Sequence, residues 1–252
     1  MIQLKNQKEI AAMKISGEIT GGALKAARAV IRPGISTREI DHVVHEYILS
    51  RGAKPSFLGY GGFPGSACVS VNDEVIHGIP GGRILHEGDL VKVDVGAYIG
   101  GFHGDAAATF PVGEISEQAR TLMDVTRQSF YEGIKYAKVG YRISDISHAI
   151  QTYAESFGFG VVRNYIGHGV GKQLHEDPEV PNYGKPGHGP RLMPGMTIAI
   201  EPMITAGSYD VHTLDNDWTV VTNDHSLAAH YEHSIVITTG EPYLLTRWED
   251  EE

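Results

Sequence analysis

Two aspartates stand where a β-hairpin would bring them together. Asp94 lies in the strand-like segment 90–98 and Asp105 in the strand-like segment 102–109, with two glycines at 100–101 between them. That is the pattern of a hairpin with a two-residue turn. Cross-strand neighbours on one face lie roughly 5–8 Å apart. Two carboxylates at that separation repel each other, so one pKa rises or a cation binds between them.

The register of this hairpin has two alternatives. If 100–101 is the loop, Asp94 lies opposite Ala107, and Asp105 is two residues away on the same face. If the loop starts one residue earlier, the two aspartates are directly opposite. The segment 93–109 contains no Lys or Arg, so a shared metal ion is the natural counter-charge. On the hairpin alone, a solvated pair of surface aspartates is an equal alternative.

Two glutamates and a histidine favour the metal hypothesis. Glu201 lies within an apolar strand predicted over 196–203, and Glu232 lies in the similar segment 230–237, where a free carboxylate is costly. His168 lies between two glycines, which let the backbone approach closely and expose the imidazole. Carboxylates with one imidazole suit Mn, Fe, Co or Zn ions. So many donors fit two divalent ions that share bridging ligands. The predicted ligand set is Asp94, Asp105, His168, Glu201 and Glu232.

The other histidines divide into two groups. His77 and His175 lie in loop-like sequence, where functional side chains concentrate, although each alone could be a surface histidine without a role. The remaining histidines are interpreted as surface or structural residues: His42, His45, His86, His103, His148, His188, His212, His225, His230 and His233.

The elements that must position these residues come in two similar sets. The segments 34–52 and 140–158 match at an offset of 106 residues, and each has a glycine turn followed by an amphipathic helix pattern. The segments 88–94 and 195–201 are both strand-like and end on a carboxylate. A third pair is His77-Gly78-Ile79 and His168-Gly169-Val170.

Three matched pairs in the same order make chance a less attractive explanation than an internal repeat. We predict an α+β chain whose related halves, roughly 1–112 and 113–252, face each other about a pseudo-two-fold axis. With no linker between them, the halves form one catalytic domain, 1–252.

Other helices and loops follow from capping and composition. Segment 6–31 is predicted to be mostly helical with Asn6 as its cap, and 36–39 is a capping-box pattern that starts the next helix. Segment 116–138 is predicted as a longer helix, and 177–194, with several Gly and Pro residues, as a loop.

Composition limits the classes of protein. Apolar residues make up 41% and charged residues 21%, which is ordinary for a globular chain. The net charge of −10 argues against a nucleic-acid partner. We expect neither a secretory signal nor a membrane span. The single cysteine excludes an internal disulfide and suits a reducing cytoplasm.

Several motifs together resemble those of type I methionine aminopeptidases, in order and over nearly the whole chain. They are NDEVIHGIP at 72–80, Asp94 with FHGD at 102–105, GHGVG at 167–171, EPM at 201–203 and YEH at 231–233. The resemblance implies the pita-bread α+β fold around a central antiparallel sheet. It implies two divalent ions (Co, Mn, Fe or Zn) on the five predicted ligands, with Asp105 and Glu232 bridging. The implied activity is removal of N-terminal methionine before a small second residue, by a bridging hydroxide.

The resemblance also implies roles for individual residues. Glu201 is the proton shuttle, His175 hydrogen-bonds the substrate carbonyl oxygen, and His77 contacts the scissile amide nitrogen or the next peptide unit. Peptide and nascent-protein N-termini, at the ribosome among other places, are the implied partners of a monomeric enzyme. The implied methionine pocket is Tyr60, Phe63, Cys68, Leu174 and Trp218, with Phe63 where tyrosine is common and Leu174 where phenylalanine is common.

Three alternatives remain. The pocket residues could be ordinary core. A Pro-bond peptidase, such as an aminopeptidase P or a prolidase, shares the fold and metal set, but it usually carries an extra N-terminal domain for which this length leaves no room. A binding protein that keeps the fold without catalysis typically loses metal ligands, and all five are present here.

Overall fold

The computed structural model describes residues 1–248, and its first two helices begin at the predicted caps. Helix α1 (Gln7–Val30) starts after Asn6, whose side chain accepts hydrogen bonds from the backbone N–H groups of Lys8 and Glu9. Helix α2 (Thr37–Ser50) has the same reciprocal capping box at Ser36. These side chains satisfy N–H groups that have no partner inside the helix, so the predicted starts are confirmed.

Two further helices belong to the second part of the chain. Helix α3 (Glu117–Ile134) begins after Ser116, as predicted, but ends four residues before 138 because the chain turns at 135–138. Helix α4 (Ile143–Ser156) packs against it, and a Cβ at Gly133 would lie 2.7 Å from Cγ1 of Ile150. Glycine therefore permits the close approach of α3 and α4.

The hairpin that carries both aspartates has the first of the two predicted registers. Strands β4 (Leu90–Ile99) and β5 (Phe102–Pro111) place Asp94 opposite Ala107 and Asp105 opposite Gly96. Gly100 and Gly101 form the turn with φ of 61° and 87°, and positive φ at both positions is the type I′ geometry that matches strand twist.

This hairpin belongs to a nine-stranded antiparallel sheet. Its strands follow the order β1-β4-β5-β14-β9-β7-β8, with β15 on β14 and β2 on β4. The bounds of the other seven are β1 (Lys54–Pro55), β2 (Ala67–Val71), β7 (Gly167–Gly169), β8 (Glu176–Val180), β9 (Thr197–Ile200), β14 (Glu232–Val236) and β15 (Tyr243–Leu244).

The remaining strands of residues 1–248 form two three-stranded sheets. One has the order β13-β10-β6, and the other has the order β11-β12-β3. Their bounds are β3 (Glu74–Ile76), β6 (Gly160–Val161), β10 (Met203–Thr205), β11 (Val211–Thr213), β12 (Val220–Thr222) and β13 (Ala228–His230); a short 3-10 turn, η1, covers Tyr60–Gly62.

The prediction of a loop over 177–194 is wrong at its start. Residues 176–180 form β8, which pairs with β7 at the edge of the large sheet. Proline cannot donate to a ladder, but an edge strand tolerates it, so Pro178 does not prevent strand formation here. The rest of the segment has no helix or strand.

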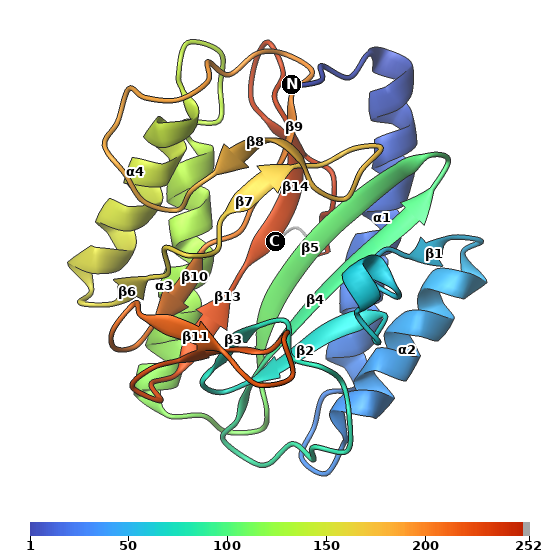
Figure 1. Cartoon of the computed structure of the whole chain (residues 1–252), viewed down its shortest axis with the longest axis vertical. Coiled ribbons are helices and arrows are strands. Elements are labelled where there is room, and N and C mark those ends of the chain that lie inside the picture. The colour runs from blue at the N-terminus through green and yellow to red at the C-terminus, as the bar shows by residue number, and fades with distance from the viewer. Residues whose placement is uncertain (249–252) are drawn as a thin grey trace.

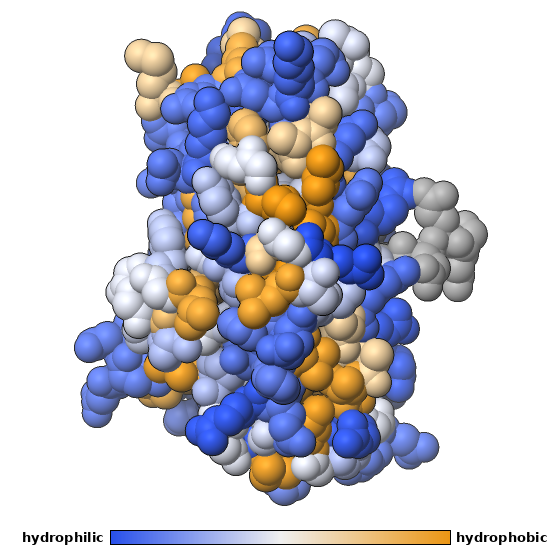
Figure 2. Space-filling model, turned by 90° about the vertical axis from the view of Figure 1, so that its right-hand side faces the viewer, coloured by the Kyte–Doolittle hydropathy of each residue, from blue (hydrophilic) through white to orange (hydrophobic). Residues whose placement is uncertain are grey.

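The four long helices flank the large sheet. In Figure 1, α1 and α2 lie to the right of the sheet and α3 and α4 to its left. The main core joins both sets, because residues such as Ile40 on α2, Val93 on β4 and Ile146 on α4 are fully buried in one cluster. The face in Figure 2 is mostly hydrophilic, with apolar residues in small separate groups. Within residues 1–248, no helix has the length and apolar character needed to cross a membrane.

The matched segments have partly matching structures. Helices α2 and α4 begin at Thr37 and Ile143, 106 residues apart, and each follows a glycine with positive φ. The third pair differs, since His168 lies within β7 whereas His77 follows β3 with φ of 58°. The division into halves near residue 112 stays a prediction.

Candidate metal centre

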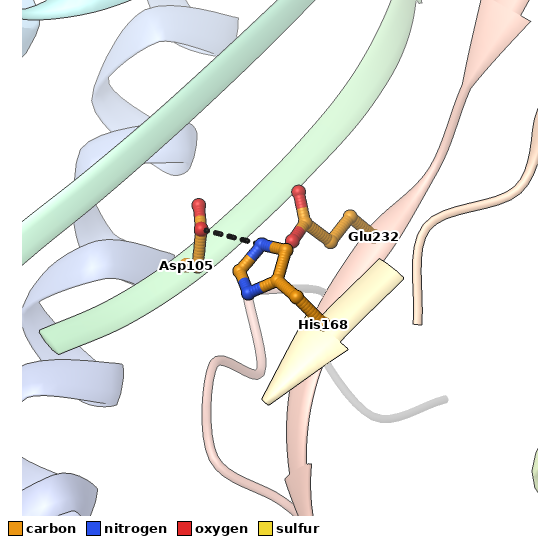
Figure 3. Close-up of side chains that lie close together, drawn as sticks. All are labelled: Asp105, His168 and Glu232. Atoms are coloured by element: carbon orange, nitrogen blue, oxygen red, sulfur yellow. Dashed lines mark ion pairs between the residues drawn. The ribbon is translucent and has the colours of Figure 1, made fainter. Parts of the chain in front are cut away.

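Three strands of the large sheet bring an aspartate, a histidine and a glutamate together. Asp105 lies on β5, Glu232 on β14 and His168 on β7, and one ligand atom from each lies within 4.8 Å of the other two. Their side chains point toward one another in Figure 3. All three are buried. The Ser234 hydroxyl on β14 accepts from the N–H of Asp105 and donates to its carbonyl oxygen, which fixes this part of β5.

Asp94 and Glu201 complete the predicted ligand set. Asp94 shares a face of the hairpin with Asp105. Glu201 is the first residue after β9, not a member of an unbroken strand, because Pro202 has no N–H to continue the ladder. Its Oε1 atom is 3.6 Å from Nε2 of His168, and Oδ2 of Asp105 is also 3.6 Å from that nitrogen.

The tautomer of His168 makes this geometry informative. Its Nδ1 is 2.8 Å from the carbonyl oxygen of Gly169, and a carbonyl can only accept, so Nδ1 carries the proton. Burial lowers the pKa of His168 to about 4, which leaves the ring neutral at pH 7. Nε2 therefore presents a lone pair toward two carboxylates, an arrangement typical of a metal-bound histidine.

Burial and mutual repulsion disfavour charge on all four carboxylates. Burial raises the pKa of Asp105 to about 7. Burial and the charge of Asp105 raise the pKa of Asp94 well above its usual value. The pKa values of Glu201 and Glu232 are raised well above the ordinary value by burial first and by neighbouring carboxylates second. Groups that repel one another in this way need a cation or protons.

The donor set fits divalent metal ions. Oδ1 of Asp94, Oδ1 of Asp105 and Oε1 of Glu232 are buried without a hydrogen-bond partner, so each has coordinating capacity that nothing else uses. The residues that line the surrounding cavity include no Lys or Arg. Carboxylates and one imidazole are the ligands that Mn, Fe, Co and Zn accept. We call these five residues the polar wall: Asp94, Asp105, His168, Glu201 and Glu232.

Two more histidines face the same cavity. The ring of His175 lies 4.2 Å from that of His168, and its Nδ1 is 2.7 Å from the Tyr60 hydroxyl. His77 lies edge-on to Tyr165 and Trp218. Burial lowers the pKa of both histidines, to about 4 for His77. Both are therefore neutral at pH 7, so each can donate one N–H without carrying charge.

Another part of the cavity lining is apolar. Phe57, Phe63, Cys68 and Leu174 form a buried cluster, which we call the apolar wall, and Trp218 packs edge-on against Phe63 at 5.1 Å. Cys68 on β2 pairs with Asp94 on β4, so the two walls meet there. All twelve residues predicted for the site line this one cavity of about 250 Å³.

Sequence reasoning missed five residues near the site. Phe57, Ile76, Tyr165 and Ile166 also line the cavity. His230, which was interpreted as surface or structural, is 1% exposed and lies 3.7 Å from Glu201. Its spacing from Glu232 was the available signal, because residues two apart in an extended chain share a face.

Known proteins resemble this chain over nearly its whole length. Residues 11–239 match the model of metallopeptidase family M24. The methionine aminopeptidase of Clostridium acetobutylicum is 55% identical over 247 residues, 98% of this chain and 99% of that protein. The crystal structure of methionine aminopeptidase from Thermotoga maritima superposes with a TM-score of 0.97 at 47% identity, covering 98% of this chain and 100% of the other.

A more distant structure shares the fold alone. Prolidase from Pyrococcus furiosus has a TM-score of 0.80 at 24% identity, covering 99% of this chain and 66% of that one. Helices that flank a central antiparallel sheet with a carboxylate and imidazole centre thus define a metallopeptidase of the pita-bread fold. The chain belongs to metallopeptidase family M24, and the two methionine aminopeptidases described above place it with that group. The predicted resemblance and fold class are confirmed.

Proposed function

We propose that this chain removes the N-terminal methionine from peptides and nascent proteins whose second residue is small. The observation that carries the proposal is the cavity itself, which is lined by both the polar wall and the apolar wall. A thioether side chain suits apolar, aromatic and sulfur surroundings, while the polar wall offers the donors that bind metal ions. The relatives named methionine aminopeptidase support the same activity.

The polar wall would hold two divalent ions, each Co, Mn, Fe or Zn, with Asp105 and Glu232 as bridging ligands. When bound, the ions supply Lewis acidity and lower the pKa of a coordinated water. Glu201 lies at the edge of the ligand set, with Oε1 toward His168, and acts as the proton shuttle. A carboxylate beside the coordinated water is suited to take and return its proton.

His175 is oriented for donation to the substrate. We assign the proton between Tyr60 and Nδ1 of His175 to the tyrosine hydroxyl, which then donates across the 2.7 Å contact. The ring proton consequently lies on Nε2, where it can donate to the carbonyl oxygen as negative charge develops. His77, which lines the same cavity edge-on to Trp218, contacts the scissile amide nitrogen or the next peptide unit.

The methionine pocket consists of three residues of the apolar wall, Phe63, Cys68 and Leu174, together with Tyr60 and Trp218. Phe63, Cys68 and Leu174 are each at most 5% exposed, so they present a rigid apolar surface. Tyr60 is 45% exposed and stands at the rim. Such a pocket excludes charged side chains because it offers them no partner.

The wider setting follows from the same proposal. We propose one catalytic domain, residues 1–252, with pseudo-repeat halves of roughly 1–112 and 113–252. The enzyme would act as a cytoplasmic monomer on nascent chains at the ribosome.

The test compares two peptide classes on one preparation. Purified protein is freed of metal, reloaded with Mn(II), Co(II) or Fe(II), and given Met-Gly-Met-Met or an Xaa-Pro peptide of matched length. We expect release of methionine from the first and no cleavage of the second. Cleavage of only the Xaa-Pro peptide would establish a Pro-bond peptidase. No cleavage of either by protein with filled metal sites would favour a binding protein.

A further inference from the structure

A buried histidine outside the predicted ligand set lies behind its glutamates. His230 ends strand β13 and is 1% exposed, and neither ring nitrogen has a hydrogen-bond partner among residues 1–248. Its Nε2 atom is 3.7 Å from Oε2 of Glu201 and 3.9 Å from Oε2 of Glu232. Buried polar groups are nearly always hydrogen-bonded, so an imidazole kept in this place requires an explanation.

Glu201 lies between two imidazoles that differ in what they offer. Its Oε1 atom faces the lone pair of His168, whose proton is held on Nδ1 by Gly169. Its Oε2 atom faces His230. Nothing accepts a proton at Nδ1 of His230, so the ring proton is stabilised on Nε2, toward the two carboxylates. His168 thus offers an acceptor to the cavity, and His230 offers a donor.

His230 is not itself assigned as a metal ligand. The ligand atoms that lie within 4.8 Å of one another belong to Asp105, His168 and Glu232. The distances of 3.7 and 3.9 Å from His230 to the glutamates exceed an N–H···O hydrogen bond by roughly 0.5–1 Å. Hydrogen bonds in such sites often tighten only when the ligand is bound.

We propose that His230 is a positioning residue of the metal centre, whose Nε2–H donates to Oε2 of Glu201 and Glu232 and thereby directs Oε1 of Glu201 toward the metal. The inference rests on the proposed function, because it needs the polar wall to bind metal ions. It assigns to His230 the outer hydrogen bond that metal-ligating carboxylates usually receive.

The test measures metal affinity in three proteins. Wild type, His230→Leu and His230→Gln are freed of metal and titrated with Co(II) by calorimetry, and the visible absorption of the bound Co(II) is recorded. Leucine removes the donor at similar volume, so affinity should fall about 10- to 100-fold, and the Co(II) spectrum should change. Glutamine carries an amide N–H near the place of Nε2 and should restore most of the affinity and the spectrum.

A second buried histidine on the adjoining strand serves as the matched control. His233 on β14 is also 1% exposed, but its ring bonds to the Tyr231 hydroxyl and to Thr246. His233→Leu should lower the Tm of the metal-free protein and keep Co(II) affinity. His230→Leu should keep the Tm of the metal-free protein, since removing an unpartnered polar group costs no hydrogen bond. It should lower Co(II) affinity.

The outcomes separate the two proposals. If wild type fails to bind Co(II), the metal centre is refuted and this inference with it. If wild type binds and His230→Leu binds equally well, only the role of His230 is refuted. The role is equally refuted if His230→Gln remains as weak as His230→Leu.

Discussion

The two walls of the cavity are built on opposite principles. The apolar wall is a packed cluster whose members bury one another, so its stability comes from ordinary burial. The polar wall gathers four carboxylates with raised pKa values and several buried oxygens without partners. A fold stabilised by its core can therefore hold, at its centre, a set of groups that repel one another until a cation binds.

The comparison predicts that replacing a polar side chain beside the polar wall lowers the turnover rate. His175→Ala should lower kcat about 10²- to 10³-fold, because it removes one donor to a developing negative charge. Metal content, measured by plasma emission spectrometry, should be unchanged, since His175 is not among the clustered ligands. His42→Ala, at an exposed position on α2, is the control. An unaltered kcat in His175→Ala would contradict the assigned role.

The raised pKa values predict that protons compete with metal at the polar wall. With a pKa of about 7, Asp105 keeps its proton as pH falls below 7 and must lose it to bind a cation. Half of the Asp105 carboxyl is already protonated at pH 7, so apparent affinity for Mn(II) should fall about 16-fold for this group alone from pH 7 to pH 5.5. His168, with a pKa of about 4, adds nothing in this range. Calorimetry in two buffers of different ionisation enthalpy counts the protons released; zero release at pH 6 would contradict the prediction.

The smallest expected effect belongs to the apolar wall. Leu174→Ala enlarges the pocket and should lower kcat/KM for methionyl peptides about 10-fold, mainly through KM. Metal affinity should stay at the wild-type value, because Leu174 contacts apolar neighbours. Leu49→Ala, exposed on α2, is the matched control. Both quantities are measured for Leu174→Ala, kcat/KM by peptide kinetics and metal affinity by titration. Weakened metal binding would show that the two walls are not independent.

Much of the local structure could be predicted from sequence because its causes lie within a few residues. Asn6 with Glu9 and Ser36 with Glu39 fix the starts of α1 and α2. The glycine pair at 100–101 fixes the turn. Strands that form within Gly- and Pro-rich sequence were less predictable. Residues 176–180 join a sheet edge, which depends on a partner strand and not on the Gly and Pro content of the segment.

The sequence by itself determined the donor types, the hairpin that places Asp94 and Asp105 on one face, and the resemblance to one family. Only the tertiary structure decided that twelve predicted residues line one cavity, that Tyr60 contacts His175, and that His230 lies behind Glu201. These contacts join residues far apart in the chain. Each depends on the pairing of strands and the packing of loops, whose energies no local pattern contains.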